Sequence, residues 1–303
     1  MPQACWVPPM PSSADDRRSS LGEEAVVFDC EGQHLVGILH HAGNASRLGV
    51  LIVTGGPQYR IGSHRQFLLL ARAFADAGFP TLRFDHRGTG DSEGPFLGFE
   101  HLEADIEAAA GALLDRAPGV ERVVLWGLCD AASAIFLYAA RDPRVAGLLL
   151  VNPWVREPEG EARALVKHYY GQRLLDAGFW RKLLVGEVAV IAALGGFAAG
   201  VTGWLRSASA SRKAQEAAAP PLSDRMAHGL AAFQGPVGLI LSGRDLTARE
   251  FEDAAAGASW RQQLAAPRVA RHSLPAADHT FSRRIWREAV TRWTLSWLAR
   301  IEI

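Results

Sequence analysis

The sequence predicts an α/β protein with a mostly parallel, doubly wound sheet, and three observations support this prediction. Short apolar runs alternate with amphipathic helical stretches between residues 48 and 151. Strands that alternate with helical stretches of this length imply a parallel sheet covered on both faces. Glycine-rich or polar segments follow the runs, at the carboxyl ends of the strands, where such sheets bind their ligands.

The composition is that of a globular protein with a sizeable core, since 49% of the 303 residues are hydrophobic and 21% are charged. The 32 basic residues balance the 32 acidic residues, so no basic surface for nucleic acid is expected. Three cysteines, an odd and sparse set, do not make a disulfide framework. They suit a reducing compartment.

Residues 1–20 are expected to be a disordered tail and residues 21–303 to be one domain. The tail is rich in Pro, Ser and Asp and lacks the basic-then-apolar order of a signal peptide, which favours a cytoplasmic location. The runs at 25–29 and 35–40, on either side of the segment that begins at Cys30, predict an antiparallel hairpin at the sheet edge.

The next strands end in turns with several glycines. The run at 48–54 leads into Gly55 and Gly56, where backbone N–H groups are free to face a ligand. Further runs predict strands at 80–85 and 145–151, and amphipathic stretches predict helices at 65–77 and 99–117.

The segment 156–233 interrupts this alternation and predicts a helical lid inserted between two strands. Within it, residues 188–205 are uncharged and approach the length of a membrane span, but they are rich in Ala and Gly. A buried or site-facing helix is the preferred interpretation. Peripheral contact of the lid with the inner membrane is the alternative.

The strongest motif is centred on Cys129. A run at 122–128 leads through a turn with the sequence Gly-Leu-Cys-Asp-Ala into an Ala-rich helical stretch at 131–140. A strand, a sharp turn with a nucleophile at its tip and a helix form a nucleophile elbow, usually G-x-S-x-G. Cys129 takes the place of the serine, and a thiolate is a better intrinsic nucleophile. The alternative is a small buried residue without chemistry.

Two more candidates follow strands predicted at 236–241 and 269–274, namely Asp245 and His279. Nucleophile, acid, histidine is the chain order of one large class of catalytic triads. His279 would take the thiol proton and later protonate the leaving group, while Asp245 orients the ring. Alternatively, Asp245 forms a turn, His279 neighbours a helix cap, or His272 is the base. An amphipathic helix predicted at 283–299 closes the chain.

The N–H groups of Gly56 and Asp130 are expected to stabilise an oxyanion. The side chains expected at the rim of the site are Gln58, Tyr59, Arg60, Asn152 and Trp154. Arg60 is equally well interpreted as a solvated surface charge. The chain lacks Cys/His spacing for a metal and a phosphate-binding loop, so we predict no metal and no cofactor.

Four motifs carry a family resemblance, GGPQYR with GSHRQF at 55–67, LRFD with RG at 82–88, WGLCDAAS at 126–133 and NPWVR at 152–156. With them the chain resembles the α/β-hydrolase superfamily from residue 23 to residue 298. Its motifs are most similar to those of the exosortase A system-associated hydrolases of type 1. The resemblance implies a bacterial protein associated with exopolysaccharide production and the sorting of surface proteins.

These residues predict acyl transfer through a thioester on Cys129 that ends in hydrolysis. The expected substrate is an ester, thioester or lactone of a small or saccharide-linked acyl group. If the lid excludes water, the same site would be an acyltransferase. A non-catalytic scaffold for a membrane-linked assembly is the remaining alternative, which the presence of Cys129, Asp245 and His279 together disfavours.

Overall fold

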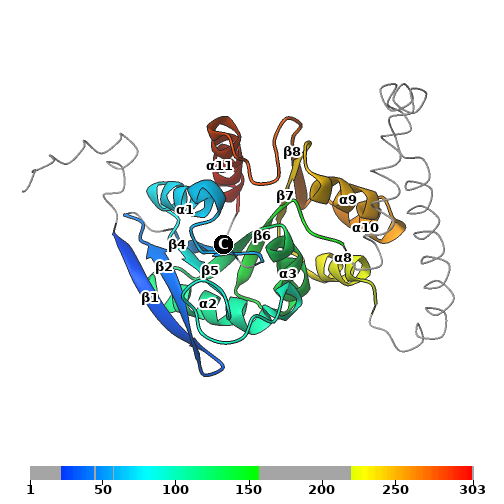
Figure 1. Cartoon of the computed structure of the whole chain (residues 1–303). Coiled ribbons are helices and arrows are strands. Elements are labelled where there is room, and N and C mark those ends of the chain that lie inside the picture. Colours follow the sequence, from blue (N-terminus) through cyan, green and yellow to red (C-terminus); the bar gives the residue numbers. More distant parts are fainter. Residues whose placement is uncertain (1–21, 44–45, 57, 157–219, 302–303) are drawn as a thin grey trace, which may run out of the picture.

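The computed structural model describes residues 22–43, 46–56, 58–156 and 220–301 (Figure 1). The expected tail and residues 157–219, which make up most of the predicted lid, lie outside these ranges.

The described residues form one eight-stranded sheet with the order β1-β2-β4-β3-β5-β6-β7-β8. Its strands are β1 (Glu23–Cys30), β2 (Gln33–His40), β3 (Leu48–Val53), β4 (Thr81–Phe84), β5 (Arg122–Leu128), β6 (Val145–Val151), β7 (Val237–Ser242) and β8 (Val269–Leu274). β2 pairs antiparallel with β1 and with β4, and every other pair is parallel. The structure therefore confirms a mostly parallel sheet that begins with an antiparallel hairpin.

Helices cover both faces of the sheet (Figure 1). The described helices are α1 (Gln66–Asp76), α2 (Glu103–Arg116), α3 (Asp130–Tyr138), α8 (Leu222–Ala232), α9 (Leu246–Ala255), α10 (Ala258–Leu264) and α11 (Arg284–Leu298), with short 3-10 turns at Ser63–Arg65, Phe99–His101 and Ala139–Arg141. α1 and α11 share one apolar cluster, whereas α2, α3 and α8 share the cluster on the opposite face. This arrangement is the predicted doubly wound sheet.

The central strands lie in the middle of these two clusters. Every residue of β3, β6 and β7 is buried. Burying one large aliphatic side chain contributes about 1.5–3 kcal/mol, which explains why the sequence shows unbroken apolar runs here. Because the carboxyl ends of these parallel strands meet at one edge, the loops after β3, β5, β6, β7 and β8 are brought to the same side of the sheet.

The described end of the predicted lid segment is a helix packed into the fold. α8 lies against α3 so closely that a Cβ on Gly229 would be 1.9 Å from the carbonyl oxygen of Phe136. Only a residue without a side chain fits this contact. Among the described residues, no helix is both long and apolar enough to cross a membrane. The apolar stretch 188–205 is outside those residues.

Candidate active site

The turn between β5 and α3 has the geometry of a nucleophile elbow. Cys129 adopts φ 64° and ψ −127°, a conformation that costs energy for any residue with a side chain. A Cβ on Gly127 would lie 2.6 Å from Ile135 Cδ1, so only glycine fits where the strand meets the helix. The Cys129 N–H donates to the carbonyl oxygen of Val151 at 2.9 Å, which fixes the strained turn to β6.

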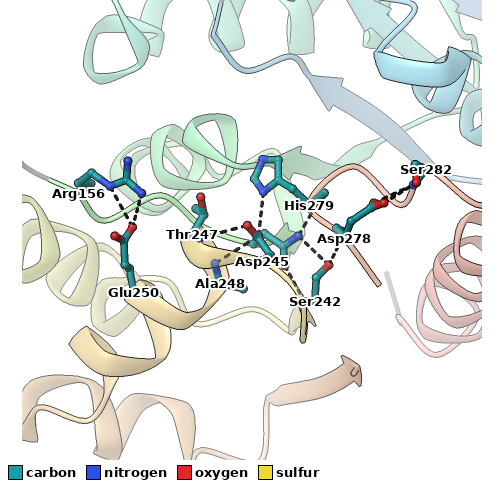
Figure 2. Close-up of polar contacts among 10 residues, drawn as sticks. Arg156, Ser242, Asp245, Thr247, Ala248, Glu250, Asp278, His279 and Ser282 are labelled. Atoms are coloured by element: carbon teal, nitrogen blue, oxygen red, sulfur yellow. Dashed lines mark hydrogen bonds and ion pairs between the residues drawn. The ribbon is translucent and has the colours of Figure 1, made fainter. Parts of the chain in front are cut away.

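The loops after β7 and β8 bring Asp245 and His279 together. His279 Nδ1 lies 2.8 Å from Asp245 Oδ2 (Figure 2). The same carboxylate accepts the N–H groups of Thr247 at 3.1 Å and Ala248 at 3.3 Å, and so caps α9. Asp245 therefore combines the helix-end role with the position expected of the triad acid.

Cys129 is the second partner of His279. Burial lowers the pKa of His279, but hydrogen bonds with Asp245 and with Cys129 outweigh burial and raise this pKa to about 10. Since Nδ1 faces Asp245, Nε2 is the ring nitrogen left for the sulfur. The three predicted side chains thus form one connected chain of contacts.

Asn152 holds the histidine loop from the end of β6. Its side chain is buried, and its backbone adopts φ 45°. Nδ2 donates to Ser242 Oγ at 3.0 Å, and Oδ1 accepts the Ser242 N–H at 2.8 Å. Asn152 is therefore a buried side chain that joins the ends of β6 and β7 by hydrogen bonds, rather than a side chain at an open rim. Ser242, the last residue of β7, is a positioning residue that sequence reasoning missed.

Trp154 supports the elbow from the following loop. Its backbone N–H donates to the Cys129 carbonyl oxygen at 3.2 Å, and its own carbonyl oxygen accepts the Ser133 hydroxyl of α3. The Arg156 guanidinium lies 4.6 Å from the centre of the Trp154 ring and pairs with Glu250 of α9 (Figure 2). The segment therefore links the elbow to α9.

The two N–H groups expected to bind an oxyanion are near Cys129, but both contact a carboxyl group. The Gly56 N–H donates to Asp130 Oδ2 at 2.7 Å, and the Ala131 N–H donates to Asp130 Oδ1 at 3.0 Å. The Asp130 N–H also contacts its own carboxyl. Burial raises the pKa of Asp130, and these N–H contacts oppose the rise.

Arg60 is not the solvated surface charge that the sequence also allowed. It is 9% exposed, and its guanidinium pairs with the fully buried Asp85 and, at 2.8 Å, with Asp91. The Arg60 N–H also donates to Asp85 Oδ1 at 2.6 Å. Arg60 is thus a buried anchor of the loop after β3, because the neighbouring loop supplies acidic partners.

The other two side chains expected at the rim differ in exposure. Tyr59 is exposed, with its hydroxyl bonded to Asp91 and its ring under the Arg60 guanidinium at 4.4 Å. Gln58 is partly buried, and its Oε1 has no hydrogen-bond partner among the described residues.

His272, the alternative base, and Asp278, the acidic residue directly before His279, make other contacts. His272 is in β8, where its ring stacks on Trp293 of α11 at 5.3 Å. Asp278 accepts the Ser282 N–H at 2.9 Å, so its carboxylate holds the start of α11 instead of the histidine ring (Figure 2). Within the described ranges no group of His, Cys, Asp and Glu could hold a metal ion.

The sheet order, the elbow and the covering helices define an α/β-hydrolase. A family model described as serine aminopeptidase, S33 (Hydrolase_4) matches residues 50–245, and the chain belongs to this family. No curated protein matches the chain.

Solved structures share the fold over nearly the whole chain. An esterase from Pyrococcus furiosus is 15% identical, with a TM-score of 0.62 and coverage of 97% of this chain and 98% of the esterase. A dienelactone hydrolase from Anabaena variabilis is 17% identical, with a TM-score of 0.58 and coverage of 93% and 99%. An α/β hydrolase from a Penicillium species is 18% identical, with a TM-score of 0.60 and the same coverage.

Proposed function

We propose that the protein is an acyl hydrolase that works through a thioester on Cys129. The contact chain from Asp245 through His279 to Cys129 at the elbow is the observation that carries this proposal. Fitting substrates are esters, thioesters or lactones of small or saccharide-linked acyl groups. From the motif resemblance we further propose that this activity serves a bacterial exopolysaccharide system that is linked to an exosortase.

The proposed mechanism uses the two ring nitrogens of His279, with Nδ1 facing Asp245 and Nε2 facing Cys129. The Cys129 thiolate attacks the carbonyl carbon, and the oxygen takes the negative charge of a tetrahedral intermediate. When the intermediate collapses, the bond to the leaving group breaks, and His279 Nε2 gives its proton to the leaving atom. Neutral His279 then takes a proton from water, which attacks the thioester and releases the acid and the thiolate. Asp245 holds the ring and stabilises its charged form throughout.

The family is named for a serine aminopeptidase, whereas this chain has Cys129 at the tip of the elbow. A serine needs a base during the attack, whereas a thiol that has passed its proton to a neighbouring imidazole attacks directly. The hydrogen bonds that raise the pKa of His279 favour a protonated imidazole beside Cys129.

Burst kinetics test the proposal directly. Wild type, with an activated short-chain ester, should release one leaving group per active site before a slower steady state. Mass spectrometry should locate the acyl group on Cys129, and Cys129→Ala should show neither burst nor adduct. Cys30→Ala is the matched control, because it removes a buried thiol from β1 and should keep the burst.

The slow phase separates hydrolysis from transfer. If water is the acceptor, adding a sugar or a simple alcohol should leave the steady state and the product unchanged. If an acceptor accelerates the slow phase and carries the acyl group, the protein is an acyltransferase. A burst that survives in Cys129→Ala would contradict the thioester on Cys129. No burst with any acyl length would contradict the acyl-enzyme mechanism and favour the scaffold.

A further inference from the structure

The Asp130 carboxyl group sits on the N–H groups that an acyl substrate needs. The Gly56 N–H is 2.7 Å from Oδ2, and the N–H of Asp130 itself contacts the same carboxyl. We propose that Asp130 is an internal occupant of the oxyanion site, which must withdraw before the carbonyl oxygen of a substrate can bind. This inference rests on the proposed acyl-transfer function and names a further residue of that site.

The fold is built to hold this carboxyl group. A Cβ on Gly55 would lie 2.0 Å from Asp130 Oδ1 and 3.0 Å from the nitrogen of Ala131. A Cβ on Gly56 would lie 3.5 Å from Oδ2. The two glycines thus leave a space that the carboxyl fills, and the chain that carries them adopts φ +52° at Gly56. The Asp130 carboxyl group therefore packs closely against the backbone of Gly55 and Gly56.

Charge makes the occupant a strong competitor. Hydrogen bonds to an ionised acceptor are about twice as strong as those between neutral groups. A carboxylate and an oxyanion would also repel each other at hydrogen-bonding distance. A substrate oxygen therefore meets N–H groups that are already used and a negative charge beside them. Acylation requires the side chain to rotate away or to become neutral.

His86 is the titratable side chain that acts on Asp130 from the loop after β4. It is 1% exposed, and its Nε2 lies 3.2 Å from the Gly56 carbonyl oxygen. Its charge lowers the pKa of Asp130. The Gly56 N–H thus contacts Asp130, and the Gly56 carbonyl oxygen contacts His86. The contact with His86 would hold the loop after β3 in place when the Asp130 carboxyl group moves away.

Rates of acylation in two variants test the occupant. Asp130→Ala removes the carboxyl and frees the Gly56 N–H, so the burst rate should rise about tenfold or more, since one oxyanion donor is worth roughly 10²–10³ in rate. Asp130→Asn keeps an oxygen on the Gly56 N–H without the charge, so its rate should lie between those of Asp130→Ala and wild type.

Alkylation of Cys129 by iodoacetamide provides the matched control. Removing a neighbouring carboxylate also favours the thiolate, and alkylation reports this effect without forming an oxyanion. The gain in acylation should therefore exceed the gain in alkylation. A short aliphatic aldehyde, which forms a hemithioacetal whose oxygen uses the same N–H groups, should inhibit Asp130→Ala more tightly than wild type.

Two outcomes would overturn the inference. Equal gains in acylation and alkylation would show that Asp130 acts only on the thiol. Slower acylation in a folded Asp130→Ala would show that the carboxyl supports the site instead of blocking it. Either result, with a burst that still depends on Cys129, leaves the proposed function in place. Loss of the Cys129 dependence itself would instead contradict the proposed function.

Discussion

Asn152 and His279, 127 residues apart, are joined by a hydrogen bond from the Asn152 side-chain Nδ2 to the His279 carbonyl oxygen at 3.2 Å. The same side chain also binds Ser242 at the end of β7. The backbone of the histidine loop is therefore fixed by β6 and β7, and the Asp245 carboxylate needs only to orient the ring.

Asn152→Ala and Asn152→Gly should separate these hydrogen bonds from backbone strain. Both remove three bonds worth about 1 kcal/mol each, so both should lower the free energy of unfolding and the burst rate. Glycine tolerates φ 45°, whereas alanine does not, so the glycine variant should be about 1 kcal/mol more stable. Urea unfolding measures this difference. Equal stabilities would show that the backbone at this position is unstrained.

The pH dependence of stability should report the charged His279. Its pKa is raised from 6.5 to about 10, so the native state binds the proton more tightly than the unfolded state. The stability that this proton contributes is complete below pH 6.5 and is lost as the pH rises towards 10. The difference in unfolding free energy between wild type and His279→Gln should shrink across this window.

His272→Gln is the control for that titration. Burial lowers the pKa of His272, so its linkage has the opposite sign. Its difference from wild type should change only below pH 6.5 and stay level from there to pH 10. A level difference for His279→Gln as well would contradict the raised pKa of His279.

The buried pair of Arg60 and Asp85 should matter for stability more than an exposed pair. Arg60→Met leaves the fully buried Asp85 carboxylate without its cation, which should cost about 3–5 kcal/mol. Arg47→Met breaks a pair with Glu121 in which both side chains are more than half exposed, and should cost less than about 1 kcal/mol. Denaturant titrations compare the two. Lost acylation with unchanged stability in Arg60→Met would place Arg60 against the substrate after all.

A double-mutant cycle should show the contact between Gly55 and Asp130. Gly55→Ala places a Cβ 2.0 Å from the carboxyl, and such overpacking typically costs about 1–3 kcal/mol. In the Asp130→Ala background the carboxyl is gone, so the same change should cost less, although Leu128 O and Ala131 N remain 3.0 Å away. Thermal unfolding of the four proteins gives the coupling. Additive effects would mean that the carboxyl does not fill this space.

The sequence predicted the sheet well because its central strands are long apolar runs between clear helical stretches. β6 was expected at 145–151 and occupies those residues. α9 and α10 were missed because both are short. In addition, α9 begins directly after Asp245, a residue weighed only as a turn-former or as the triad acid. The N-cap pattern of Asp245 before Thr247 was the available signal.

The site was predictable as a set of residues at one edge, but not as contacts between atoms. Gly56 and Asp130 were both expected there as backbone donors, yet they are 74 residues apart, and only the fold shows the side chain of one bound to the N–H of the other. The burial of Arg60 was missed for the same reason, since its charge alone does not reveal that Asp85 is buried beside it.

The double use of the Asp245 carboxylate has an evolutionary consequence. Because it caps α9 as well as holding His279, a lineage that gave up the chemistry would still be selected to keep a capping residue at this position. Among the residues that the structure describes, the His279 ring contacts Asp245 and Cys129 and caps no helix. In a descendant that has lost catalysis, we therefore expect His279 to be replaced first, while Asp245 is kept as the cap of α9.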